Sequence, residues 1–370
     1  DQFAVRGGFG YTGSIDKNAL PFVVMTLGQS VIYDGQTVPT SFSYPNPNVK
    51  WQTKQDMNVG LDLSLFDYRL ELGANYYNNI TRDVLDRKAL PYSSGRSEVT
   101  ENVADIYNSG WEIDLGVTLL KNKSFQWYAK ANIAINDNKV KNTYYKDTKD
   151  LPKATLSNAH QFVENQPVNG WYGYKFAGIN PINGAVMTYT GNGEATLDMS
   201  VSGATWPIPS VFYLGNLTPP VVGGFSTSAN WKQLIFSANF EFKTGHKIKS
   251  FNTFRSLDAR NRHTSEANRW REPGDITNVP AMSEAFTTYS SYMYDILLEK
   301  GNYLRCSYMT LGYNLKPEWL HKIGFSTARL SFTAKDLFTV SSYSGIDPAL
   351  MGSFGYPNSR KYTITLNVGF

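Results

Sequence analysis

The sequence has a single cysteine, Cys306, and no long uninterrupted apolar run. One cysteine cannot form an internal disulfide, and the lack of a second one excludes zinc ribbons and thioredoxin-type motifs. No apolar segment approaches the ~18 residues that a membrane-spanning helix needs. A β-barrel crosses a membrane with alternating residues, so the mean hydropathy of −0.35 does not exclude a membrane protein.

Charged residues are also scarce. Asp, Glu, Lys and Arg make up 18% of the 370 residues, whereas Phe, Trp and Tyr make up 14%. An ordinary soluble domain carries about 25% charged residues. The formal net charge of +4 is too small to indicate nucleic-acid binding. The aromatic content excludes a disordered chain.

Motifs for catalysis and metal binding are missing as well. No nucleophile elbow, zinc-protease or kinase string occurs, and the four histidines have no co-ligands at metal-binding spacing. Gly8 to Gly13 matches the dinucleotide fingerprint only in form, because Pro21 follows where a helix should run. We therefore expect no enzyme, no catalytic residue, no metal and no cofactor. An enzyme with catalytic residues spread over several strands is the alternative.

The dominant pattern is alternation with a period of two residues. Near the C-terminus, Tyr362, Ile364, Leu366, Val368 and Phe370 fall on one face, and polar residues or glycine fall on the other. The same alternation recurs in the segments 57–65, 70–76, 111–119, 125–135, 234–242, 309–315 and 330–334. Each segment is predicted to be a long strand with one apolar face and one polar face.

The connections between these strands alternate between short and long. Tight turns are predicted at 66–67, 121–123, 181–184 and 231–232, with a slightly longer one at 316–325. Long loops are predicted at about 12–50, 83–102, 140–169, 192–220, 247–300 and 340–360. This alternation is typical of outer-membrane barrels, and it gives about twelve strands. The predicted fold class is an all-β transmembrane antiparallel β-barrel, with a soluble β-sandwich as the alternative.

Three strings resemble a known family. They are Pro45 to Trp51 running into Asp56 to Asp62, then Asp105 to Ile113, and finally Glu299 to Arg305 leading to Leu311 to Tyr313. Arg6 to Gly13, Arg269 to Asp275 and Ala334 to Thr339 add support. Over essentially its whole length, the chain resembles the C-terminal portion of SusC/RagA-type TonB-dependent transporters of the Bacteroidota outer membrane.

The resemblance implies a larger assembly. Such transporters close about 22 strands around a plug domain, so residues 1–370 would supply about twelve C-terminal strands of one barrel domain. The chain opens in an alternating pattern, so we expect a fragment that lacks the plug and the first strands. The implied partners are that remainder, TonB acting through it, a SusD-like surface lipoprotein, and membrane lipid and lipopolysaccharide. A dimer of transporter–lipoprotein pairs is left open, and nucleic acid is not expected.

The resemblance also implies a function, which is TonB-dependent nutrient import across the bacterial outer membrane. The SusD-like lipoprotein would capture an oligosaccharide or a peptide and deliver it to the lumen. A passive porin-like channel and a structural or adhesin barrel are the alternatives. The residues upstream of Asp1 would separate the channel from the importer, because only the importer has a plug.

Candidate contact residues lie in the long loops. Flat aromatic faces with a polar rim suit both sugar rings and peptide side chains, although packing between loops is the alternative for each residue. The candidates for contact with cargo or lipoprotein are Trp171, Tyr172, Tyr174, Trp206, Tyr213, Arg269, Trp270 and Arg271. The terminal Phe370 resembles the C-terminal signal that barrels present to their assembly machinery, or is a lipid-facing aromatic.

Overall fold

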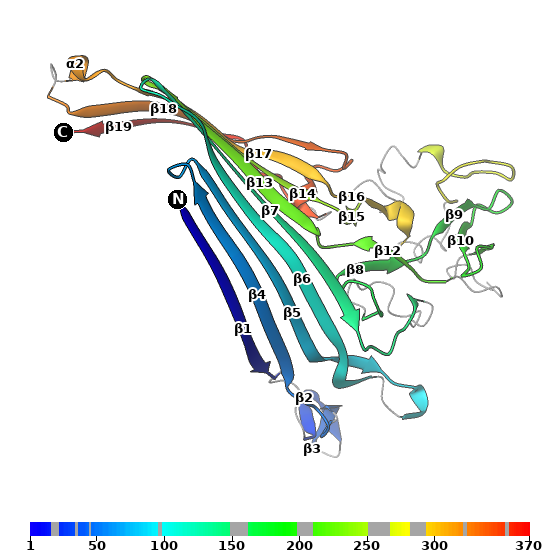
Figure 1. The fold of residues 1–370 in the computed structure, drawn as a ribbon. Coiled ribbons are helices and arrows are strands. Elements are labelled where there is room, and N and C mark those ends of the chain that lie inside the picture. The colour runs from blue at the N-terminus through cyan, green and yellow to red at the C-terminus, as the bar shows by residue number, and fades with distance from the viewer. Residues whose placement is uncertain are drawn as a thin grey trace.

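A curved antiparallel sheet dominates the computed structural model (Figure 1). The structure describes residues 1–15, 22–33, 36–43, 46–94, 98–148, 162–197, 210–250, 267–281, 294–320, 324–351 and 355–370. The sheet, called the wall below, has ten strands in the order β1-β4-β5-β6-β7-β13-β14-β17-β18-β19. In the described part of the chain, β1 pairs only with β4 and β19 pairs only with β18, so both edges of the wall are unpaired.

The wall strands are long, and the shorter strands lie at one end of the wall. The wall consists of β1 (Gln2–Ser14), β4 (Gln52–Leu65), β5 (Leu70–Ala89), β6 (Glu98–Lys121), β7 (Phe125–Lys141), β13 (Val221–Trp231), β14 (Leu234–Thr244), β17 (Tyr303–Asn314), β18 (Thr327–Ser341) and β19 (Lys361–Gly369). The short strands are β2 (Val24–Tyr33), β3 (Gln36–Ser43), β8 (Gly170–Gly173), β9 (Phe176–Ile179), β10 (Val186–Tyr189), β11 (Ala195–Leu197), β12 (Phe212–Asn216), β15 (Lys247–Lys249) and β16 (Leu298–Lys300).

The helical elements among the described residues are single turns: η1 (Tyr92–Ser94), η5 (Asp295–Leu297), α2 (Pro317–Leu320) and η7 (Pro348–Leu350). Among the described residues, no helix has the length and apolar character needed to cross a membrane.

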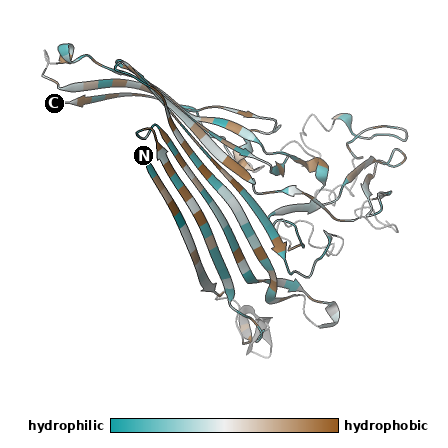
Figure 2. Cartoon of the chain, viewed as in Figure 1, coloured by the Kyte–Doolittle hydropathy of each residue, from teal (hydrophilic) through white to brown (hydrophobic). Residues whose placement is uncertain are grey.

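The strand register sorts side chains by polarity across the wall. One row joins Val59, Tyr76, Trp111, Ile135 and Val221 on five successive strands. Successive side chains of a strand point to opposite faces, so one register brings together residues of one kind. A row on the opposite face carries Asp62, Asp114, Asn132, Glu241 and Arg305. Figure 2 shows hydrophobic and hydrophilic positions alternating along the strands. The two faces are called the apolar face and the polar face below.

The face assignment predicted for the C-terminal strand is confirmed by this register. Ile364 lies opposite Phe332, and Leu366 lies opposite Leu330, both on the apolar face. The ring centroids of Phe332 and Tyr362 are 6.1 Å apart in a stacked arrangement. Thr363 pairs with polar Thr333 on the other face, as the alternation requires.

Four of the five predicted short connections join neighbouring wall strands at the same end of the wall. They link β4 to β5, β6 to β7, β13 to β14, and β17 to β18 through α2. This end is called the turn end, and the end with the short strands is the lobe end. The C-terminus lies at the turn end, where the Ser326 amide donates to the Gly369 carbonyl.

The fifth predicted turn, Pro181 to Gly184, lies elsewhere. It joins β9 and β10 in a three-stranded sheet at the lobe end, where the Asn180 side chain accepts a hydrogen bond from the Ile182 amide at 2.9 Å. Turn chemistry is the same in either place, so the local sequence does not distinguish them. Strands of four residues are too short to span a membrane, which takes about nine to eleven. The wall therefore has ten strands rather than the expected number of about twelve.

The predicted loop at 83–102 is also shorter than expected. β5 continues to Ala89 and β6 begins at Glu98, because pairing resumes beyond an irregularity at Val84. The Asp105 carboxylate bridges this irregularity by accepting from the Asp83 amide at 3.0 Å. The hairpin thus projects past its neighbours at the lobe end.

Candidate functional site

The polar face of the wall carries charged and amide side chains whose interactions with one another contribute little to stability. Arg6 and Asp62 form an exposed ion pair at 2.7 Å, and Lys130 lies 3.9 Å from Asp114. Exposed pairs of this kind contribute about 0–1 kcal/mol each, so they are typical of a hydrated surface. Within the described residues, no group of three or more His, Cys, Asp or Glu is placed to hold a metal ion. The polar face suits the lining of a water-filled passage.

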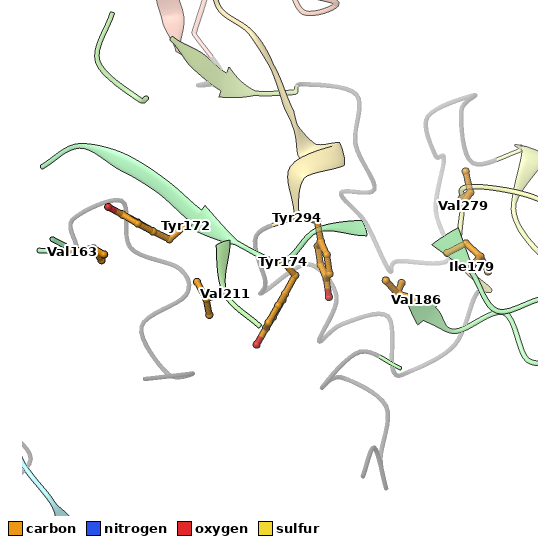
Figure 3. Packing of buried hydrophobic residues seen from close by; sticks show 8 residues of the cluster. All are labelled: Val163, Tyr172, Tyr174, Ile179, Val186, Val211, Val279 and Tyr294. Carbon is orange, nitrogen blue, oxygen red and sulfur yellow. The ribbon is translucent and has the colours of Figure 1, made fainter. Parts of the chain in front are cut away.

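A small hydrophobic core builds the lobe end. The surrounding unit, called the loop lobe, comprises the described residues 162–197, 210–217, 267–281 and 294–300. Figure 3 shows its buried cluster, which includes Tyr172 of β8, Tyr174 directly after β8 and Tyr294 directly before η5, among smaller aliphatic residues. The ring centroids of Tyr174 and Tyr294 are 6.0 Å apart. Aromatic burial of this kind holds segments together that are more than a hundred residues apart in the chain.

Three of the predicted contact residues lie inside this lobe rather than on its surface. Trp171, Tyr172 and Tyr174 are 9%, 2% and 0% exposed. The indole nitrogen of Trp171 donates to the Lys247 carbonyl at 2.7 Å, and burial raises the pKa of Tyr172. The burial of these three rings agrees with the alternative of packing between loops, and their contact with cargo or lipoprotein stays a prediction.

The other predicted contact residues are more accessible. Tyr213 is half-buried with its ring centroid 5.8 Å from that of Tyr172, and burial raises the pKa of Tyr213 to about 12. Trp270 is half-buried and donates to the Pro181 carbonyl at 3.1 Å. Arg269 is half-buried, and the exposed Arg271 guanidinium donates to the Ala267 carbonyl at 3.0 Å. Trp206 lies outside the described residues.

A strap formed by residues 342–351 folds over the polar face. Arg305 is only 6% exposed and lies 2.5 Å from the Asp347 carboxylate, while its Nε donates to Thr339 at 3.1 Å. Glu241 lies 3.9 Å away on the neighbouring strand. Arg305 belongs to a string that the sequence singled out, but nothing local to Asp347 identified it as the partner.

Two further contacts hold the same strap. The Tyr343 hydroxyl donates to the Lys249 carbonyl at 3.0 Å, and Ser344 donates to Glu299 from its amide at 2.8 Å and its hydroxyl at 2.6 Å. Burial alone would raise the pKa of Glu299, but hydrogen bonds from Ser250 and Ser344 outweigh burial and hold that pKa below its ordinary value. The strap is thus fixed to the lobe end of the wall by charge and by hydrogen bonds.

The C-terminal residue lies at the turn end. Phe370 is 93% exposed, and its ring meets that of Phe325 edge-on with centroids 5.1 Å apart. An exposed terminal ring is accessible to a partner, so the geometry leaves the predicted assembly role of Phe370 open as a proposal.

Comparison with known proteins identifies the wall. The family model described as a TonB dependent receptor-like β-barrel matches residues 1–241. The chain belongs to this TonB-dependent receptor family. "TonB-dependent receptor P3" of Formosa agariphila is 29% identical over 99% of the chain. "TonB-dependent receptor SusC" of Bacteroides thetaiotaomicron is 22% identical over 88% of the chain.

Solved structures agree with this assignment to the TonB-dependent receptors. The RagAB peptide transporter is 25% identical over 100% of the chain, with a TM-score of 0.74. The RagAB peptide importer in its open-open state is 26% identical, with a TM-score of 0.76. The chain covers 39% of the P3 receptor, 32% of SusC and 41% of the RagAB chain. The predicted resemblance to SusC/RagA-type transporters is confirmed, and these relatives are receptors and transporters rather than enzymes.

Proposed function

We propose that the protein imports nutrients across the bacterial outer membrane as a TonB-dependent transporter and has no catalytic activity. The observation that carries this proposal is the strand pairing that gathers apolar side chains on one face of the ten-stranded sheet and polar side chains on the other. That separation supports a wall with lipid on one side and a hydrated lumen on the other. Membership in the TonB-dependent receptor family supports coupling of this import to TonB.

The apolar face fits a membrane in both width and chemistry. β18 has fifteen residues, more than the about nine to eleven that a transmembrane strand requires. Exposed aromatic side chains near the strand ends suit the interface between lipid and water. They include Trp51, Trp127 and Trp231. In this orientation the turn end faces the periplasm and the loop lobe faces the outside.

The loop lobe supports a lipoprotein partner on the outer side. Ile182 is 75% exposed and Ile276 is 98% exposed, and their segments meet where the Gly274 amide donates to the Pro181 carbonyl at 2.8 Å. Exposed apolar side chains at one place on an ordered loop suit a protein interface. We therefore propose that a SusD-like lipoprotein docks here and delivers an oligosaccharide or a peptide. Two such pairs could associate as a dimer.

The edges of the wall require further partners. β1 and β19 have unpaired edges within the described residues, and unpaired backbone groups in hydrocarbon cost several kcal/mol each. We propose that further strands of a larger barrel, surrounding a plug domain, complete both edges. Membrane lipid and lipopolysaccharide would cover the apolar face.

Uptake measurements test this function against its alternatives. A strain lacking the gene, a strain lacking TonB and a wild-type strain treated with a protonophore are supplied with radiolabelled mixtures of oligosaccharides and of peptides. The importer predicts loss of uptake of one mixture in all three conditions. Uptake that survives the protonophore would favour a passive channel, and uptake unchanged by gene deletion would favour an adhesin or structural barrel. Purification from native outer membranes should also recover the lipoprotein.

A further inference from the structure

A pocket of about 540 Å³ lies at the lobe end, where β7 continues beyond the beginning of β13. Three segments close around it. The Asn136 amide donates to the Pro220 carbonyl at 2.8 Å, and the Leu217 amide donates to the Asn169 carbonyl at 2.9 Å. The pocket is therefore walled by ordered backbone on several sides, and its volume lies within the range of about 300–1,000 Å³ that is usual for ligand sites.

The lining of the pocket is neutral and rich in amides. Six of its fifteen lining residues are asparagines: Asn108, Asn136, Asn138, Asn165, Asn169 and Asn216. The only charged side chains in the lining are Asp137 and Lys139, which pair with each other at 2.6 Å. No unpaired charge is therefore offered to a ligand by the described lining.

Five of these six amides accept a hydrogen bond through their oxygen atoms. Asn138 accepts from the Val168 amide and Asn165 accepts from Lys141. The Oδ1 of Asn136 accepts from the Tyr77 hydroxyl at 2.7 Å, and that of Asn216 accepts from the Tyr213 hydroxyl at 2.5 Å. The Oδ1 of Asn108 accepts from the Asn138 side chain at 3.4 Å. In the described part of the chain, the NH₂ groups of Asn108, Asn136 and Asn216 have no hydrogen-bond partner. They are oriented donors that an oxygen-rich ligand would satisfy.

Flat apolar surfaces lie beside these donors. The half-buried ring of Tyr213 lines the pocket together with Pro167, Pro219 and Pro220. A sugar ring combines an apolar C–H face with a rim of hydroxyl groups, which matches an aromatic ring flanked by amides. A peptide with charged termini or side chains would find no opposite charge here, and burying an uncompensated charge is costly.

We propose that this pocket binds the end of a neutral oligosaccharide. This proposal rests on the proposed import function and specifies the class of molecule that would be imported. Ring hydroxyls accept hydrogen bonds from the Asn136 and Asn216 amides while one sugar face packs on Tyr213. Uronates and peptides are bound more weakly, because the lining supplies no free cation. The peptide cargo in the description of the RagAB structures would then not carry over to this protein.

Binding measurements on the native protein, purified from outer membranes with its co-purifying lipoprotein, test the site. Calorimetry is run with neutral hexasaccharides of glucose, mannose, xylose and galactose, with hexagalacturonate and with hexa-alanine. Asn136→Asp and Asn216→Asp keep the oxygen that accepts from tyrosine but replace the free donor with a negative charge. We expect at least one neutral hexasaccharide to bind, and each variant to weaken that binding by about tenfold.

The matched control is Asn48→Asp, which makes the same change at an exposed asparagine outside the pocket and should leave affinity unchanged. The proposal would be overturned if hexa-alanine or hexagalacturonate bound more tightly than the neutral sugars, or if no neutral sugar bound. It would also be overturned if neither pocket variant changed the affinity for a neutral sugar. If uptake by cells still depends on energy when the pocket proposal fails, the proposed import function is retained. Sugar binding without energy-dependent uptake would instead support the pocket and refute the importer.

Discussion

Arg305 is a charged side chain buried at the lobe end of the wall, and its position depends on a partner forty-two residues away in sequence. A buried ion pair is stable only while both partners are present, because a lone charge retains its full desolvation cost. Gly301, four residues earlier, must instead have no side chain. A Cβ atom there would lie 2.4 Å from the His246 Nε2, so the backbone can pass the buried histidine only without a side chain.

Replacing Asp347 with alanine should release the strap. The change leaves Arg305 without its closest partner, at a local cost of about 3–5 kcal/mol. Hydrogen exchange of residues 342–351 should become much faster in the variant. Adding Arg305→Met removes the stranded charge and should restore part of the protection. Unchanged exchange in Asp347→Ala would show that the ion pair does not hold the strap.

Gly301→Ala should destabilise the junction of β16 and β17 by about 1–3 kcal/mol, because the added methyl group overlaps the His246 ring. Thermal unfolding and folded yield in the outer membrane measure the effect. Gly7→Ala is the control, since nothing lies within 4 Å of a Cβ atom at that position. A loss of equal size in both variants would point to strand propensity rather than to the histidine.

The stability of the same junction should fall at mildly acidic pH. Burial, followed by the charge of Lys243, lowers the pKa of His246 below its ordinary value of 6.5. The opened state therefore binds more protons than the closed state, so stability is complete above about pH 6.5 and is lost as pH falls through the lower native pKa. Hydrogen exchange of residues 245–250 between pH 7.5 and 5 should show this loss, and His246→Gln should flatten it. If the wild type and His246→Gln showed the same pH dependence, a group other than His246 would be responsible for the loss of stability.

At the scale of elements, glycines in β6 let tyrosines from neighbouring strands cross it. A Cβ atom at Gly110 would lie 2.5 Å from the Tyr77 hydroxyl, which reaches over β6 to Asn136 on β7. A Cβ atom at Gly116 would similarly lie 2.6 Å from the Tyr128 hydroxyl. An aromatic ring covering a strand glycine stabilises register and curvature. The glycine before Trp111 thus serves cross-strand packing, a role that its sequence context alone did not reveal.

Gly110→Ala should disturb the packing of β5, β6 and β7 more than the loss of the tyrosine hydroxyl does. The added methyl group meets both the Ile135 backbone carbonyl and the Tyr77 ring, whereas Tyr77→Phe removes only one hydrogen bond, worth about 0.5–1.5 kcal/mol. The folded fraction, measured by the heat-dependent gel shift of outer-membrane extracts, should fall in the order wild type, Tyr77→Phe, Gly110→Ala. The reverse order would show that the Tyr77 hydrogen bond matters more than the close approach of Tyr77 and the Ile135 carbonyl to Gly110.

In the molecule as a whole, the unpaired edges of the wall limit the kinds of barrel that it can form. β1 and β19 lie at opposite ends of the strand order, and neither is paired on its outer edge within the described residues. A membrane does not tolerate such edges, so they must meet either each other or further strands. The family assignment and the partial coverage of its relatives favour further strands.

Cysteine pairs distinguish the two arrangements. In a Cys306→Ser background, Val5→Cys with Leu366→Cys should not crosslink, because β1 and β19 would each face a different strand. Ala334→Cys with Tyr362→Cys is the positive control, since these residues are cross-strand neighbours in β18 and β19. Efficient crosslinking between β1 and β19 would demonstrate a small closed barrel and contradict the larger one.

The faces of the long strands follow from the amino-acid sequence alone, although the number of strands does not. Alternation with a period of two is a property of neighbouring residues, so Ile364 and Leu366 could be placed on the apolar face before any pairing was known. The tertiary structure alone decided the loop lobe, where the Phe176 amide donates to Asp295 over 119 residues of sequence. Burial of Tyr174, the partner of Arg305 and the place of the Pro181 turn all depend on such distant contacts, which leave no local pattern.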